Sequence, residues 1–232
     1  MTTVVDGPLV ALISAVPTAI PPAERAFAAE FPAAHVWNLL DDRLLPEADL
    51  AGGLTPALHE RMKRLIQHAE AEGADGILLS CSVYGAVAQA MAAESSIPIL
   101  APDDAAFAAA VNGGYDTVLV VSNAPGPLAD SEERLIETAV RGGVLLDVVG
   151  VVAPRAAAAA ASGDVEALVD AVHRAVLVAA VSPDAILLGQ YSLAPAAERL
   201  SDLTGLPVLA GPQRAVSELR QILDSKSTEA SA

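Results

Sequence analysis

The sequence is poor in cysteine and histidine, which narrows the chemistry that it can support. Its single cysteine, Cys81, cannot form a disulfide within the chain, so nothing in the sequence requires an oxidising compartment. The four histidines are scattered and show no paired Cys/His spacing of the kind that binds zinc. They are His35, His59, His68 and His173. We therefore predict no metal site and interpret these histidines as structural or surface residues.

Basic residues are also scarce. The chain has 13 Lys and Arg residues against 29 Asp and Glu residues, which gives a formal net charge of −16 at pH 7. Such a charge repels phosphate backbones and anionic membranes, so we expect neither a nucleic acid nor a membrane as a partner. An anionic substrate must then be held by local groups.

Long hydrophobic runs are missing as well. The apolar stretch LVALISAV, residues 9–16, is too short to span a bilayer. It is preceded by Asp6 and lacks the basic region that begins a signal peptide. These features predict no signal or membrane segment, and a cytoplasmic location.

The chain is nevertheless rich in apolar residues. Hydrophobic residues make up 53% of its 232 residues and the mean hydropathy is +0.46, which is enough to bury a sizeable core. A chain of this length fits one large α/β domain or two small lobes.

Short apolar runs alternate with amphipathic segments of helical length, which indicates βα units and a parallel sheet. The predicted strands are 9–14, 35–40, 76–80, 97–101, 117–122, 145–152, 185–189 and 206–210. The predicted helices lie near 22–31, 55–72, 85–95, 128–141, 164–180 and 194–204. For the second of these helices, Thr55 supplies an N-cap and Pro56 a favourable first residue.

The second half of the chain repeats the first. Asp75 and Asp184, Cys81 and Gln190, and Pro98 and Pro207 are three pairs with one constant separation, so no gap is needed between them. Strand, turn, helix and proline therefore recur in register, which indicates two homologous lobes.

The repeat also predicts the domain boundaries. We expect a first α/β lobe at 1–103, a second at 104–211, a helix at 212–224 that packs on the first lobe, and a flexible tail at 225–232. Asp103 and Asp104 are interpreted as structural residues at the start of a helix. The alanine-rich stretch 156–161 is given no function.

Cys81 ends an apolar run in ILLSCSVYG, where a helix begins. Ligands of parallel sheets gather at the carboxyl ends of the strands, where N–H groups of the next helix point outward. A helix N-terminus stabilises a thiolate and lowers a cysteine pKa from its free value of about 8.5, which makes the sulfur a nucleophile or proton carrier. A buried structural cysteine is the alternative.

Gln190 occupies the repeat position of Cys81, in ILLGQYSLA. It cannot exchange a proton at neutral pH, but its amide can donate and accept hydrogen bonds. It either orients the substrate or serves as a polar turn residue, and the same alternatives apply to Tyr191 and Ser192.

The first strand of each half ends in a loop with hydroxyl or amide donors and proline, SAVPTA at 14–19 and SNAPGP at 122–127. Together with backbone amides after the third strands, these donors can bind a carboxylate without a lysine or arginine. Ordinary helix capping is the alternative. The predicted substrate-binding residues are Ser14, Pro17, Thr18, Ser82, Val83, Tyr84, Ser122, Asn123, Gln190, Tyr191 and Ser192.

The chain resembles the aspartate/glutamate racemase superfamily, which includes hydantoin racemases, maleate cis-trans isomerases and arylmalonate decarboxylases. The likeness covers nearly the whole chain and rests on LLSCSVYG, its repeat LLGQYSLAP, the two loops, and PILAP matched by PVLAG. It implies two pseudo-symmetric flavodoxin-like lobes, each a short parallel sheet flanked by helices, with an active site in the interlobe cleft. It also implies a small carboxylate-bearing substrate, no cofactor, and a homo-oligomer such as a dimer.

The sequence departs from the racemases of this family, which use two thiols on opposite faces of a carbon. Because glutamine cannot replace a base, symmetric racemisation by Cys81 and residue 190 is disfavoured. Arylmalonate decarboxylase-like members use one cysteine, but in the second half. The position of Cys81 in the first half is similar to the one used for covalent attack in maleate isomerase-like members, which keep a second cysteine as well.

Three functions follow from these features. The leading hypothesis is a cofactor-independent isomerase or racemase-family enzyme that acts on a small carboxylate with Cys81 as its catalytic residue. The second is a decarboxylase or lyase that uses Cys81 for one-sided proton delivery or attack. The third is a catalytically inactive two-lobed protein that binds small acids.

Overall fold

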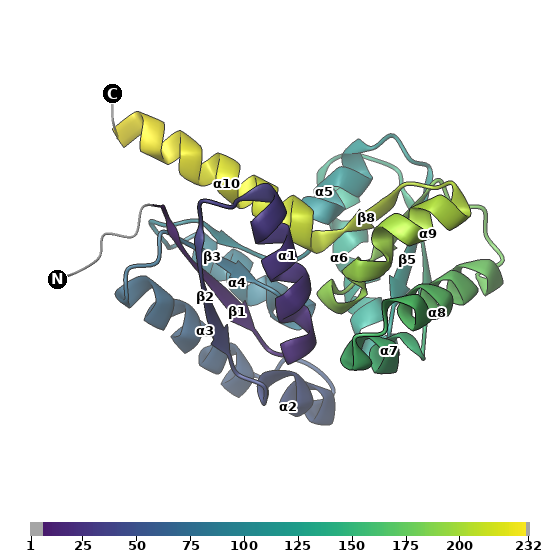
Figure 1. Cartoon of the computed structure of the whole chain (residues 1–232), viewed down its shortest axis with the longest axis horizontal. Helices are drawn as coiled ribbons and strands as arrows, with labels where there is room; N and C mark the ends of the chain where they lie inside the picture. Colours follow the sequence, from purple (N-terminus) through teal and green to yellow (C-terminus); the bar gives the residue numbers. More distant parts are fainter. Residues whose placement is uncertain (1–6, 231–232) are drawn as a thin grey trace. The chain divides into compact units, whose positions relative to one another are not determined.

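The computed structural model describes residues 7–230 and divides the chain into two compact units (Figure 1). Unit 1 comprises the chain up to Pro102 together with the segment from Pro212 onward, and unit 2 comprises Asp103–Gly211. Each unit is built around its own four-stranded parallel sheet. The predicted α/β class, with the same short parallel sheet occurring twice, is therefore confirmed.

Unit 1 has the strand order β2-β1-β3-β4. Its strands are β1 (Leu9–Ser14), β2 (His35–Leu40), β3 (Gly76–Leu79) and β4 (Ile99–Leu100). Its helices are α1 (Ile20–Glu30), α2 (Leu44–Ala51), α3 (Pro56–Ala71), α4 (Gly85–Ala92) and most of α10 (Gly211–Ala230), with short 3₁₀ helices η1 (Pro17–Ala19) and η2 (Ser82–Tyr84). Strands and helices alternate along the chain, so every crossover between parallel strands contains a helix.

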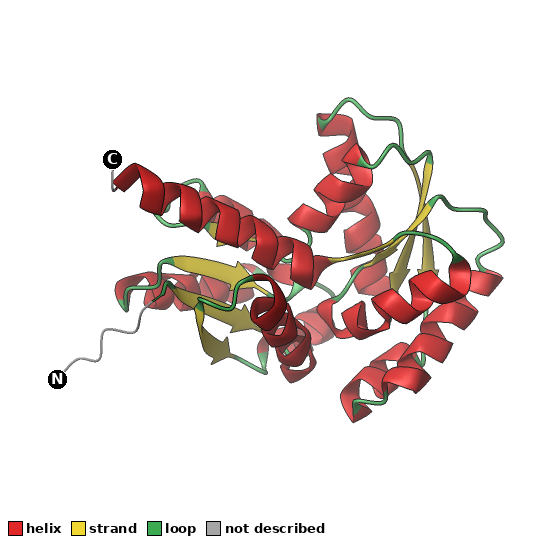
Figure 2. Cartoon of the chain, turned by 45° about the horizontal axis from the view of Figure 1, so that its top comes forward, coloured by secondary structure: helices red, strands yellow, loops and turns green. Residues whose placement is uncertain are grey.

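Helices cover both faces of the unit 1 sheet (Figure 2). Alternate residues of β1 point to opposite faces, and Ile13 packs with Met62 and Ile66 of α3 in one apolar cluster. Helix α10 lies so close to the other face that a Cβ at Gly76 would be 3.0 Å from Leu219 Cδ1. A glycine at this position allows the close approach of helix and strand.

The start of α3 is fixed by its first residues. Thr55 is in an extended conformation and its hydroxyl accepts a hydrogen bond from the Leu58 N–H at 3.3 Å, while Pro56 lies in the first turn. The predicted N-cap and first-turn proline are therefore confirmed.

Unit 2 repeats this pattern with the strand order β6-β5-β7-β8. Its strands are β5 (Thr117–Ser122), β6 (Asp147–Val152), β7 (Ala185–Leu188) and β8 (Val208–Ala210). Its helices are α5 (Asp104–Asn112), α6 (Pro125–Arg141), α7 (Ala156–Ser162), α8 (Val165–Val178) and α9 (Ala197–Thr204), with the 3₁₀ helix η3 (Tyr191–Ala196). Since both sheets place their first strand between the second and third, the strand ends of the two units can be compared position by position.

The unit 2 sheet is also apolar on both faces. On one face Val118 and Val120 of β5 cluster with Phe107 of α5 and Leu135 of α6. On the other face, Leu119 and Val121 belong to a cluster that includes residues of α7, α8 and α9. Alternation along one buried strand therefore supplies both layers of the core.

Helices α2 and α7 were not predicted from the sequence, and α10 extends beyond its predicted end at residue 224. Helix α7 comes from the alanine-rich stretch and ends at Gly163, whose left-handed φ of 71° forms the C-cap. Residues 225–230, which the sequence analysis assigned to a flexible tail, continue α10. Lys226 donates a hydrogen bond to the Ser96 carbonyl at 2.8 Å and so ties this last part of the helix to unit 1. Residues 231–232 lie outside the described residues.

Within residues 7–230, no helix combines the length and the apolar character that a bilayer crossing requires.

Candidate active site

Two serine hydroxyls meet at the carboxyl edge of the unit 1 sheet. Ser14 ends β1, Ser80 follows the neighbouring strand β3, and both are buried. Their Oγ atoms are 2.8 Å apart, and the Ser80 N–H donates to the Ile13 carbonyl at 3.0 Å. The two strand ends are thus joined by side chains as well as by the sheet.

Cys81 follows Ser80 at the predicted edge. It has an extended backbone, with φ −121° and ψ 118°, and occupies the N-cap position of η2, which leads into α4. Its exposed fraction is only 7%, and it belongs to the apolar cluster of unit 1. The thiol therefore lies at the start of a helical turn, as predicted for a reactive cysteine, and among apolar neighbours, as predicted for a structural one.

Tyr84 ends the turn that Cys81 begins. Its N–H donates to the Cys81 carbonyl at 3.1 Å, and its hydroxyl donates to the Leu44 carbonyl at 2.9 Å. Burial raises the pKa of Tyr84 well above its usual value, and a negative charge on Cys81 raises it further. The Tyr84 side chain is fully buried, and its hydroxyl anchors the turn to Leu44, the first residue of α2.

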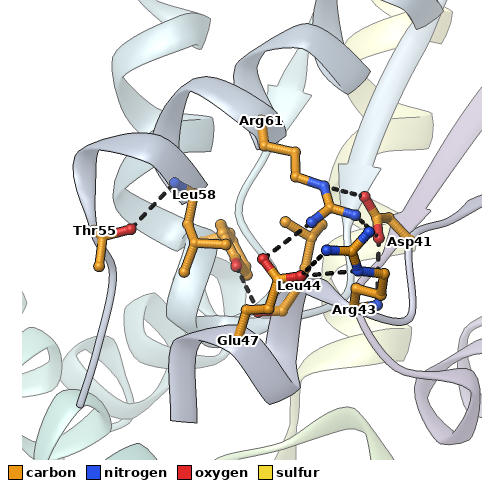
Figure 3. A network of polar contacts seen from close by, with 8 residues as sticks. Asp41, Arg43, Leu44, Glu47, Thr55, Leu58 and Arg61 are labelled. Atoms are coloured by element: carbon orange, nitrogen blue, oxygen red, sulfur yellow. Dashed lines mark hydrogen bonds and ion pairs between the residues drawn. The ribbon is translucent and has the colours of Figure 1, made fainter. Parts of the chain in front are cut away.

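Around Leu44, whose carbonyl accepts the Tyr84 hydroxyl, charged side chains form a network that was not predicted from the sequence (Figure 3). Arg61 of α3 contacts Asp41 through two nitrogens, each at 2.6 Å, and Glu47 of α2 at 3.2 Å. Burial lowers the pKa of Arg61, but the negative charge of Asp41 and the hydrogen bonds between Arg61 and Asp41 raise it, and the net effect is a raised pKa. The signal was present in the sequence, because Asp41 directly follows a predicted strand.

Glu47 is shared between two arginines. Arg43 contacts it at 2.6 Å, one turn earlier on the chain, and Arg61 contacts its other oxygen. The pKa of Glu47 is lowered from its usual value, chiefly by the hydrogen bond from Arg43. Both partners therefore keep Glu47 ionised.

The remaining predicted residues of unit 1 lie in the two 3₁₀ helices at this edge. Pro17 is exposed and Thr18 is partly buried in η1, after β1. Ser82 is buried and Val83 is partly buried in η2, after Cys81. All of them follow the carboxyl end of a strand, as the sequence analysis expected.

In unit 2, Gln190 follows β7 and forms hydrogen bonds to the end of β5 at the matching edge of the sheet. Its Nε2 donates to Ser122 Oγ at 2.6 Å, and its Oε1 accepts from the Asn123 N–H at 3.1 Å. The Ser122 hydroxyl in turn donates to the Ala124 carbonyl at 3.1 Å. Gln190 occupies the N-cap position of η3, as Cys81 does for η2, but both ends of its amide hold the neighbouring strand end.

Tyr191 and Ser192 are buried at the start of η3. The Tyr191 hydroxyl has no hydrogen-bond partner among the described residues. Burial raises the pKa of Tyr191 well above its usual value, and the charges of Asp103 and Asp104 raise it further. These two aspartates pair with Arg134 at 3.0 and 3.1 Å, which agrees with a structural role at the start of α5.

In the part of the chain that the structure describes, no three His, Cys, Asp or Glu side chains are grouped to hold a metal ion. One of the four histidines, His68, packs edge-on against Trp37 at a ring distance of 5.5 Å. This contact is structural.

A surface pocket of about 560 Å³ lies in unit 1, away from Cys81. Its lining includes Pro8, Asp75 and Ile97, which precede β1, β3 and β4. It therefore opens at the amino ends of these strands, whereas Cys81 follows a carboxyl end.

The fold is similar to those of several solved enzymes. Glutamate racemase isoform RacE1 from Bacillus anthracis aligns with a TM-score of 0.76 and 14% identity, over 95% of this chain and 83% of that chain. Allantoin racemase from Klebsiella pneumoniae aligns with a TM-score of 0.69 and 15% identity, over 95% and 89%. The Gly74Cys mutant of arylmalonate decarboxylase aligns with a TM-score of 0.64 and 20% identity, over 94% of each chain.

At the level of sequence, no curated protein matches this chain significantly. A family model described as Asp/Glu/Hydantoin racemase matches residues 55–219. This match covers more than half of the sequence and includes both Cys81 and Gln190. The chain therefore belongs to the Asp/Glu/Hydantoin racemase family.

Proposed function

We propose that this protein is a cofactor-independent isomerase that acts on a small carboxylate, with Cys81 as its single catalytic thiol. The observation that carries the proposal is the difference between the two matching strand ends. In unit 1 the strands are joined by Ser14 and Ser80, and a thiol follows them at the start of η2. In unit 2 the matching residue, Gln190, is itself the link between the strands.

This difference argues against racemisation by two bases at residues 81 and 190. An amide does not exchange a proton at neutral pH, and both ends of the Gln190 amide are already engaged within unit 2. The reaction must then be one that a single sulfur can complete.

Isomerisation of a carbon–carbon double bond next to a carboxylate meets this condition. The Cys81 thiolate adds to one alkene carbon and forms a C–S bond, while the π electrons move onto the other carbon and its carboxylate. Rotation about the resulting single bond follows. The electron pair then re-forms the double bond and expels the thiolate, so no second acid or base is consumed.

The negative charge that develops on the carboxylate needs donors that are already in place. The first N–H groups of a helical turn point away from the turn, and η2 supplies those of Ser82 and Val83 beside Cys81. Because these amides follow Cys81 directly in the chain, we assign carboxylate binding to them.

The test is a screen of small unsaturated and substituted carboxylic acids, followed by proton NMR. Wild-type protein is expected to convert one cis or trans unsaturated acid into its isomer, without incorporating solvent deuterium. Cys81→Ala and Cys81→Ser should lose this conversion while keeping the circular dichroism of the wild type. Unchanged conversion by either variant would overturn the role of Cys81.

Decarboxylation is the second candidate, favoured by the single thiol and by the fold shared with arylmalonate decarboxylase. Here the substrate loses carbon dioxide and its bonding electrons remain as an enediolate. The Cys81 S–H protonates the carbon from one side, and the thiolate regains its proton from water. Release of carbon dioxide, with an optically pure deuterated product in deuterium oxide, would identify this reaction.

The burial of Cys81 favours a third candidate, a binding protein without catalysis. A cysteine residue that is 7% exposed and lies among apolar side chains resembles a structural cysteine. This function predicts binding of a small acid by calorimetry with the same affinity in wild type and Cys81→Ala, and no conversion by either.

A further inference from the structure

Cys81 lies in a closed ring of contacts at the carboxyl edge of the unit 1 sheet. Ser14 is joined to Ser80 through their hydroxyls, and its carbonyl accepts the Asp41 N–H at 3.0 Å. The Asp41 carbonyl accepts the Leu44 N–H at 3.1 Å. The Leu44 carbonyl accepts the Tyr84 hydroxyl, and the Tyr84 N–H returns to Cys81. The ring therefore connects the thiol-bearing turn to the ends of β1, β2 and β3.

Ion pairs of Arg61 with Asp41 and Glu47 stabilise the part of this ring between residues 41 and 47 (Figure 3). Arg61 binds Asp41 with two nitrogens and Glu47 with one, so it holds both ends of the segment that carries Leu44. The side chains of Arg61 and Asp41 are only 23% and 18% exposed, so solvent screens this pair less than an exposed one. Arg61 therefore fixes the carbonyl to which the Tyr84 hydroxyl donates.

Unit 2 has the same backbone contacts. The Ala153 N–H donates to the Ser122 carbonyl at 2.7 Å, as that of Asp41 does to Ser14. The Ala156 N–H donates to the Ala153 carbonyl at 3.0 Å, as that of Leu44 does to Asp41.

Three side chains of the unit 1 network, those of Asp41, Glu47 and Tyr84, have no polar counterpart in unit 2. Ala153 stands in place of Asp41, and Ala159 stands in place of Glu47 at the fourth residue of the matching helix. Leu193, at the position that matches Tyr84, has no hydroxyl. The backbone is thus common to both halves, whereas the side-chain network occurs only in the half that carries the thiol.

We propose that Tyr84 and Arg61 are positioning residues for Cys81, with Arg61 acting through Leu44 and Tyr84 on the η2 turn. The proposal rests on the proposed catalytic role of Cys81. Tyr84 fixes the far end of the turn, so that the η2 amides and the thiol keep one geometry. Neither residue is expected to contact the substrate.

Because Cys81 is the only cysteine, alkylation by iodoacetamide reports on it alone and needs no substrate. The measurement is the pH at which the alkylation rate of the folded protein is half-maximal. This midpoint reports stabilisation of the thiolate by its surroundings and not only access to it. The ionisable groups that act on Tyr84, and through it on the turn, are Cys81, Arg61, Asp41 and Glu47.

Tyr84→Phe removes one hydroxyl and keeps the ring, so the turn loses its anchor while the core stays filled. Its midpoint should rise by about half to one pH unit, which is the effect of one hydrogen bond on a single protonation equilibrium. Arg61→Gln should raise the midpoint similarly. The midpoint of the double variant should rise no further than that of the single variant with the larger change, because both residues act through Leu44.

Two further variants separate position from charge. Arg61→Lys keeps the charge but loses the fork that holds Asp41 and Glu47, so it should behave like Arg61→Gln. Arg174→Gln removes an arginine from an exposed pair with Asp170 on α8 and should leave the midpoint unchanged. A wild-type midpoint in Tyr84→Phe, or in Arg61→Lys, would overturn the proposal for that residue, and so would an equal shift in Arg174→Gln.

The two proposals fail separately. If no substrate is found, or if Cys81→Ala keeps its turnover, the proposed function fails while the alkylation midpoints still report positioning. If turnover depends on Cys81 but the midpoints do not move, the function stands and the positioning role is wrong.

Discussion

The side-chain amide of Gln190 donates to the hydroxyl of Ser122 at 2.6 Å and so links the ends of β7 and β5 in unit 2. In unit 1 the matching hydroxyl, Ser14, is held by Ser80 instead. Gly189 takes the place of Ser80 in unit 2, and a Cβ there would be 3.0 Å from Ser131 Oγ. Ser80 therefore donates to or accepts from the matching serine in unit 1, whereas Gln190 makes this side-chain contact in unit 2.

Gln190→Leu should destabilise the protein by about 1–3 kcal/mol, because it leaves the Asn123 N–H and Ser122 hydroxyl without these partners. The free energy of unfolding from urea denaturation measures this loss. Gln67→Leu, at an exposed position on α3, serves as the control and should change stability by less than about 0.5 kcal/mol. Equal effects at the two positions would contradict the linking role of Gln190.

Ser80→Ala should cost about 1–2 kcal/mol, since it removes the partner of the buried Ser14 hydroxyl. The double variant Ser14→Ala/Ser80→Ala should be less destabilised than the sum of the two single variants, because it removes both hydroxyls of the pair. Urea denaturation of all four proteins gives this coupling energy. Strictly additive losses would show that the 2.8 Å contact contributes nothing.

Tyr84→Phe should lower the free energy of unfolding at neutral pH by about 1 kcal/mol, through loss of the bond to Leu44. The deficit should shrink at alkaline pH. The pKa of Tyr84 is raised in the folded protein, so its stabilisation is complete below 10.0, the ordinary tyrosine pKa, and is lost as the pH rises through the folded value. Denaturation of both proteins at neutral and alkaline pH tests whether their free energies of unfolding become more similar as the pH rises. A constant difference between them would contradict this prediction.

Arg134→Met should be among the most destabilising changes in unit 2, at about 3 kcal/mol or more, because it removes the arginine paired with buried Asp103. Arg134 also lies over the Phe107 ring at 5.1 Å, and this contact would be lost too. The matched control is Arg174→Met, whose exposed pair with Asp170 should be worth less than about 0.5 kcal/mol. Thermal unfolding compares the two, and similar losses would contradict the buried pair.

Much of the fold was predictable from local signals. Buried parallel strands are continuous apolar runs, and caps such as Thr55 mark helix starts, so strands and long helices could be placed from the sequence. Helix α2 contains Pro46 and is only 8 residues long, and α7 is an alanine run without an apolar stripe. Neither gives the periodic pattern that identifies an amphipathic helix.

The edge on which the site residues lie was predictable, but their partners were not. Strand ends place Ser14 and Cys81 at one edge of a sheet and Ser122 and Gln190 at one edge of another. Whether Gln190 turns toward Ser122 depends on a rotamer that no sequence pattern encodes. The contact between Asp41 and Arg61 depends on how α3 packs beside β2, which is a tertiary property.

In the proposed function one sulfur, that of Cys81 at the start of η2, performs the reaction. Its most direct test is the conversion of small unsaturated and substituted carboxylic acids by wild-type protein and by Cys81→Ser, followed by NMR in deuterium oxide. We expect conversion by the wild type and a loss of about a hundredfold or more in the folded variant. Conversion at the same rate by Cys81→Ser would contradict it.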